Sequence, residues 1–238
     1  MIETTSEDCE QAPPAFAKSP ELSRSQLLCM ARGFTLIFWG LLITLVLFFA
    51  NAFFEIFNSV RIPAYVIGSA IVALGLFGLH GAERISRAWV RRTRVVLFLV
   101  MLQIYFAPFV AWWQATPYVS MLLVNCLCLI LAGMLSLFYI NLLVAESVRR
   151  MDAGAAGTGS GLFAAAVFLL MIVPFSIVVG PPVVAAIYHR TSFYSEMWSM
   201  INKVPAWAYA LVALPCALTL VAAWKAKDRC YRKFLAGN

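Results

Sequence analysis

The stretch His80–Arg94 reads HGAERISRAWVRRTR and holds five of the chain's eighteen lysines and arginines within fifteen positions. Long uncharged apolar stretches flank it on both sides. Lysine and arginine collect in the cytoplasmic loops of membrane proteins, where they set the orientation of the neighbouring helices. The stretch therefore predicts a cytoplasmic connection between two membrane-spanning helices, and the rest of the chain can be placed outward from it.

The overall composition supports a membrane protein. Of 238 residues, 63% are hydrophobic and only 12% are charged, whereas a soluble domain is about one quarter charged. So few polar groups could not cover the surface of a soluble protein. The natural solvent of this chain is therefore a bilayer. The net charge of +7 comes without any recognition motif for nucleic acid, and we expect no nucleic-acid partner.

The apolar stretches predict an all-α integral membrane protein, a bundle of six transmembrane helices with short loops. A helix of about 20 residues crosses the hydrocarbon core of a bilayer. The predicted spans cover residues 33–54, 63–79, 95–113, 118–145, 162–181 and 205–224. They lie in a membrane domain, 28–225, between a polar tail expected to be disordered, 1–27, and a basic cytoplasmic tail, 226–238.

The distribution of positive charge predicts the orientation. With six spans, fifteen lysines and arginines lie on the side of the two termini and three on the opposite side. The positive-inside rule then places both termini in the cytoplasm. We expect a plasma-membrane protein, of the kind found in the bacterial inner membrane.

The connection between the second and third spans carries a stripe of arginines. Arg84, Arg87, Arg91 and Arg94 recur at helical spacing, and Trp89 lies on another face, where an indole suits the headgroup layer. This predicts a basic amphipathic segment at the inner surface. It would contact anionic lipid headgroups or dock an acidic partner.

Proline positions shape the remaining connections. Pro108, Pro174 and Pro215 lie inside predicted spans, where a missing backbone donor favours kinks. Gly180-Pro181-Pro182 predicts the end of the fifth span. Beyond it, the apolar spacing over 192–202 predicts a short amphipathic helix on the outer surface.

Two faces of the predicted helices stand out. Small residues share one face of the second span and favour close helix packing; they are Gly68, Gly75, Gly78 and Ala82. A polar stripe on the fourth span, with companions on the third and fifth, would line a solute pathway or form interhelical hydrogen bonds. Its members are Gln103, Asn125, Cys128, Ser136, Tyr139 and Ser176.

The sequence lacks the residues and motifs that several classes of membrane protein require. No Asp, Glu, Lys, Arg or His lies in the central part of any predicted span, which disfavours proton-coupled transport. The sequence carries no Walker motif, HExxH motif or paired histidines for haem. We predict no catalytic, cofactor-binding or metal-binding residues. Five dispersed residues leave an interfacial membrane enzyme as a third alternative: Glu55, His80, Glu83, Glu146 and His189.

From these observations we expect a non-enzymatic accessory or scaffold subunit of a larger membrane assembly, in contact with other membrane subunits or with itself. The alternative is a small-solute transporter or channel that uses the polar stripe of the fourth span.

Overall fold

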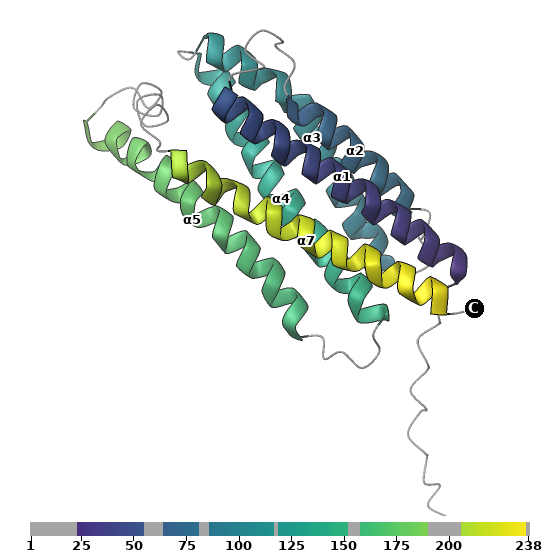
Figure 1. The fold of residues 1–238 in the computed structure, drawn as a ribbon. Coiled ribbons are helices and arrows are strands. Elements are labelled where there is room, and N and C mark those ends of the chain that lie inside the picture. The colour runs from purple at the N-terminus through teal and green to yellow at the C-terminus, as the bar shows by residue number, and fades with distance from the viewer. Residues whose placement is uncertain are drawn as a thin grey trace, which may run out of the picture.

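The computed structural model describes residues 23–54, 64–80, 86–116, 119–151, 158–189 and 206–236. This part of the chain is helical and contains no strand (Figure 1). Its helices are α1 (Arg24–Phe54), α2 (Ala64–His80), α3 (Arg87–Ala115), α4 (Ser120–Met151), α5 (Thr158–His189) and α7 (Ala206–Ala236). The predicted outer-surface helix at 192–202 lies outside the described residues.

The helices have the length and surface of membrane-spanning segments. In the described part of the chain, α1, α3, α4, α5 and α7 are long and apolar enough to cross a bilayer, and α2 is a shorter apolar helix. Large apolar side chains point outward; Phe98 is 63% exposed and Met121 is 70% exposed. Soluble proteins rarely expose such surface over a large area. The chain is therefore a multi-pass helical membrane protein.

Every described lysine and arginine lies toward the same end of the bundle. We call it the basic end, where α1, α3 and α5 begin and α2, α4 and α7 finish. The tightest core also lies there, because five helices meet at it. Its fully buried side chains include Phe34, Leu79, Trp89, Leu143 and Cys230.

The helices α1 and α2 form a close antiparallel pair, with glycines at the contact. Gly33 faces Gly75, and Gly40 faces Gly68 one heptad further along both helices. Small residues let two backbones approach each other in lipid. The predicted packing role of Gly68 and Gly75 is confirmed, whereas Gly78 has only ordinary contacts and Ala82 lies outside the described residues.

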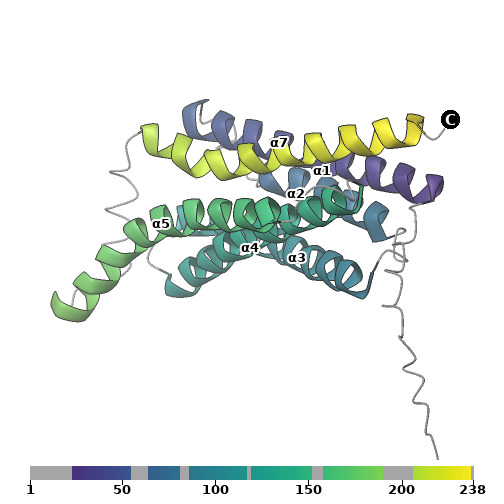
Figure 2. The ribbon, with the colours of Figure 1, turned by 90° about the horizontal axis from the view of Figure 1, so that it is seen from below.

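The helix α5 differs from the prediction at its far end. It continues through Pro181 and Pro182 to His189, so the predicted break there is wrong. Proline fixes a φ angle that a helix accepts, and the two missing backbone donors are tolerated in membrane helices. Figures 1 and 2 show the far part of α5 diverging from the other helices.

The remaining helix ends extend beyond the predicted spans. Residues 87–94 form the first two turns of α3 and are not a separate segment, and α7 runs through the predicted basic tail to Ala236. At the other terminus α1 begins at Arg24. Ser23 and Gln26 cap it reciprocally, each backbone N–H donating to the other side chain at 3.0 Å and 3.3 Å.

Candidate functional site: an intramembrane cavity and a buried carboxylate

A cavity of about 490 Å³ lies between the described helices and is lined by all six of them. Volumes of this size are typical of small-molecule sites. Most of the lining is apolar, and Phe48, Ile130 and Phe175 contribute large side chains. The cavity therefore suits a molecule that is mostly apolar.

Of the six residues of the predicted polar stripe, Gln103 and Ser136 lie at this cavity. The Nε2 atom of Gln103 donates to Oγ of Ser136 at 2.9 Å, and that hydroxyl donates to the Gly133 carbonyl at 2.8 Å. This hydrogen bond links α3 to α4. The Oε1 atom of Gln103 forms no hydrogen bond with the described residues, so it remains an acceptor at the cavity wall.

The other four stripe residues do not line the cavity. Ser176 is exposed on α5 and donates to the carbonyl of Ile172 on its own helix. Tyr139 packs against the core near the basic end. Asn125 and Cys128 lie closer to the opposite end of α4, and the Nδ2 atom of Asn125 is buried without a hydrogen bond to the described residues. Of the six stripe residues, only Gln103 and Ser136 therefore lie at this cavity.

Two prolines lie in the cavity wall, Pro174 on α5 and Pro215 on α7. A proline cannot donate to the carbonyl four residues earlier. For these two prolines the carbonyls belong to Leu170 and Leu211, which also line the cavity. The wall thus contains main-chain acceptors that lack their usual helical donors.

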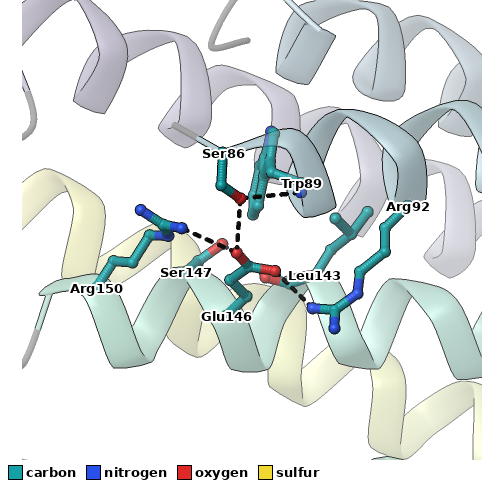
Figure 3. A network of polar contacts seen from close by, with 7 residues as sticks. All are labelled: Ser86, Trp89, Arg92, Leu143, Glu146, Ser147 and Arg150. Carbon is teal, nitrogen blue, oxygen red and sulfur yellow. Dashed lines mark hydrogen bonds and ion pairs between the residues drawn. The ribbon is translucent and has the colours of Figure 1, made fainter. Parts of the chain in front are cut away.

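A second polar arrangement lies at the basic end, around the side chain of Glu146 on α4 (Figure 3). This carboxylate is only 4% exposed and forms ion pairs with Arg92 of α3 and Arg150 of α4. Arg150 Nη2 lies 3.2 Å from its Oε1 atom. Buried carboxylates need such partners, because the cost of removing an unpaired charge from water is large.

Ser86 connects the same carboxylate to the start of α3. Its hydroxyl donates to Glu146 Oε1 at 3.1 Å and accepts from the backbone N–H of Trp89 at 3.0 Å. Ser86 is the N-cap of α3, so one side chain both begins the helix and joins it to α4. We call this network the clamp around Glu146, because its ion pairs and hydrogen bonds join α3 to α4.

The residues predicted to contact the inner membrane surface differ in their exposure. Arg87, Arg91 and Arg94 are exposed and line a shallow, largely open groove of about 570 Å³ on the surface of α3. Trp89 is fully buried, so the prediction that it contacts headgroups is wrong. It belongs to the core because its position on α3 faces the other helices. Arg84 lies outside the described residues.

The five residues considered for an interfacial enzyme are not brought together as one described site. Glu55 and Glu83 lie outside the described residues. His80 ends α2 at the basic end, whereas His189 ends α5 at the opposite end. Within the described residues no group of three or more histidines, cysteines or carboxylates could hold a metal ion.

Comparison with known proteins adds no assignment, since no family model, curated protein or solved structure matches the chain.

Proposed function

We propose that this protein is a carrier that binds a small, mostly apolar molecule in the central cavity, within the plane of the bilayer. The observation that carries this proposal is the cavity itself, about 490 Å³ in volume and lined by every described helix. Helices that only pack against each other would close such a space, because empty volume forfeits contact energy.

The polarity of the lining indicates the class of solute. The hydroxyls of Thr44 and Ser136 donate to carbonyls of their own helices, those of Gly40 and Gly133. No charged residue is among the described lining residues. The few acceptors of the lining would not replace the water shell of an ion, since ion pathways need charges or rings of carbonyls. A molecule with an apolar body and one hydrogen-bond donor, placed on Gln103 Oε1, fits better.

The positions of the prolines support movement of the cavity wall. Pro174 and Pro215 interrupt the backbone hydrogen bonds of α5 and α7 at the level of the cavity. Past Val167, Pro182 is the only buried residue among those of α5 whose side chains the structure describes. We therefore propose that α5 is the helix that moves to admit and release the solute.

A cavity-filling substitution tests the proposal. A Cβ atom at Gly133 would meet nothing within 4 Å, and Gly133 lines the cavity, so Gly133→Leu should occupy it. In lipid nanodiscs, wild-type protein should bind the apolar fluorophore N-phenyl-1-naphthylamine saturably, by energy transfer from tryptophan. Gly133→Leu should leave only the non-saturable signal of partition into lipid.

The matched control is Gly161→Leu. Gly161 is equally open but is not among the cavity residues, so this variant should bind as wild type. Equal saturable binding by wild type and Gly133→Leu, or none by either, would count against a ligand cavity.

We also infer that the basic end faces the cytoplasm of a plasma membrane such as the bacterial inner membrane. The described basic residues gather at that end, as the positive-inside rule requires of a cytoplasmic face. A phosphatase that is active only outside the cytoplasm, fused after Asn238, should be inactive, and a cytoplasmic fluorescent protein at the same position should be fluorescent.

A second candidate function, the accessory subunit expected from the sequence, is favoured by the outer surface of α5. Large exposed side chains form one stripe along it: Leu162, Leu169, Val173, Ile177 and Val184. A neighbouring membrane helix could cover this stripe. Cysteine cross-linking from Leu169→Cys and Ile177→Cys in native membranes would then capture one defined protein, whereas a carrier acting alone would give none.

A further inference from the structure

We propose that the groove along the basic end of α3 binds one anionic phospholipid, with its phosphate between Arg87 and Arg91 and an acyl chain along Phe98. The groove measures about 570 Å³ and is lined by Arg87, Val90, Arg91, Arg94, Val95 and Phe98. It is separate from the central cavity and does not depend on the proposed carrier function.

The first step of the argument is the shape of this surface. Arg87, Arg91, Arg94 and Phe98 follow each other at spacings of four, three and four residues, so they share one face of α3. The three arginines are exposed, and Phe98 is 63% exposed. Valines flank the stripe within the groove. One helix face thus offers cations at one end and an apolar surface at the other.

The second step is the position of the groove along the membrane normal. Arg94 is the last charged residue before an uncharged stretch that extends to Ala145. Lipid phosphates lie at the boundary between charged and apolar surface, and acyl chains lie beneath them. The order from Arg87 to Phe98 along the helix therefore matches the order from phosphate to acyl chain in a phospholipid.

The third step is the charge that faces the ligand. No carboxylate is among the described residues of the groove. The neighbouring Arg92 points elsewhere, because it pairs with Glu146 inside the bundle. Guanidinium groups bind phosphate oxygens with paired hydrogen bonds. A zwitterionic lipid would bring a cation as well as a phosphate to this surface, so the groove favours a lipid with net negative charge.

The test uses purified full-length protein in mild detergent, titrated with dioleoyl phosphatidylglycerol or dioleoyl phosphatidylcholine, with bound lipid counted by native mass spectrometry. Each basic residue near a membrane surface contributes about fivefold to the binding of anionic lipid. Wild type should retain phosphatidylglycerol in preference, and Arg87→Gln/Arg91→Gln should weaken that binding roughly twenty-five-fold on the same basis.

The control Arg149→Gln/Lys225→Gln removes the same charge from exposed positions outside the groove and should bind phosphatidylglycerol as wild type does. Phe98→Ser, in contrast, should weaken the binding of phosphatidylglycerol, because the acyl chain loses its contact with the ring. Thermal unfolding without added lipid checks that the variants fold.

Three results would overturn the proposal. Equal losses of phosphatidylglycerol binding in Arg87→Gln/Arg91→Gln and in the charge-matched control would show that net charge alone, and not the groove, determines the binding. Displacement of the lipid by glycerol phosphate at equal concentration would assign the groove to a soluble phosphate compound. An acidic protein that co-purifies with wild type in place of lipid, and is lost in Arg87→Gln/Arg91→Gln, would assign it to a protein partner.

Discussion

Gly40 of α1 and Gly68 of α2 face each other so closely that a Cβ atom on either would lie 2.8 Å from the carbonyl oxygen of the other. Real Cβ atoms do not approach a backbone oxygen to this distance, so the two helices would have to separate. The contact repeats one heptad away, where a Cβ on Gly75 would lie 2.8 Å from the carbonyl oxygen of Gly33. Two glycine pairs therefore set the distance between α1 and α2.

Gly40→Ala is expected to destabilise the protein by about 1–3 kcal/mol, the usual cost of adding a methyl group to a closely packed contact. Alanine also favours the helix by about 1 kcal/mol, so the clash has to exceed that gain. Gly78→Ala is the control, because its Cβ would have its nearest neighbour at 3.7 Å. Thermal unfolding in mild detergent should show a loss for Gly40→Ala and none for Gly78→Ala; equal behaviour would contradict the glycine contact.

The clamp around Glu146 is expected to stabilise the basic end. Removing one partner of a fully buried ion pair costs about 3–5 kcal/mol. The side chains of Arg92 and Arg150 remain 34% and 27% exposed, so we expect a smaller loss of about 1–3 kcal/mol for Glu146→Gln. Arg149→Gln, at an exposed position on the same helix, should change the unfolding temperature little.

A double-mutant cycle measures how much of the stability lost in Glu146→Gln comes from the interaction of Glu146 with Arg92. If Arg92 acts through Glu146, Glu146→Gln should cost less in an Arg92→Gln background than in wild type. Additive losses would mean that the two residues stabilise the protein independently.

Ser86 and Ser23 allow a matched comparison of two helix caps. Aspartate and serine are about equally good at an ordinary N-cap, so Ser23→Asp should be neutral for α1. Ser86→Asp would place a second carboxylate against Glu146, whose Oε1 atom lies 3.1 Å from the serine hydroxyl. We expect it to lower the unfolding temperature at neutral pH, and an unchanged temperature would mean that the Ser86–Glu146 contact does not form.

Gly133→Leu should leave the protein as stable as wild type or make it more stable. The new side chain enters open space, and replacing a helical glycine gains up to about 1 kcal/mol. Thermal unfolding measures this directly. A large loss of stability would show that the space beside Gly133 is not available, and the binding test based on this variant would then have to use another lining position.

The sequence predicts the class of fold because hydropathy is decided by residues close together in the chain. Apolar length and charge placement indicate a bundle of membrane helices, and residue spacing alone identifies the packing face of Gly68 and Gly75. The matching seven-residue spacing of Gly33 and Gly40 on α1 was a usable signal for their partners. The Ser23–Gln26 spacing was likewise a signal for the start of α1.

The site is less predictable, because it depends on contacts between distant segments. Arg150 is four residues from Glu146, a spacing that predicts a pair on one helix. The partnership of Glu146 with Arg92 spans 54 positions and follows from how α3 and α4 pack. The burial of Trp89 and the cavity beside Gln103 likewise follow from the packing of several helices.

The central claim is that the cavity holds a molecule, and the most direct test is organic extraction of purified protein followed by mass spectrometry. Wild type and the control Gly161→Leu should each release the same small, mostly apolar compound, near one per protein and beyond the bulk lipids. Gly133→Leu should release less than a tenth of that amount. The same compound at the same stoichiometry from Gly133→Leu, or no such compound from wild type, would contradict the account.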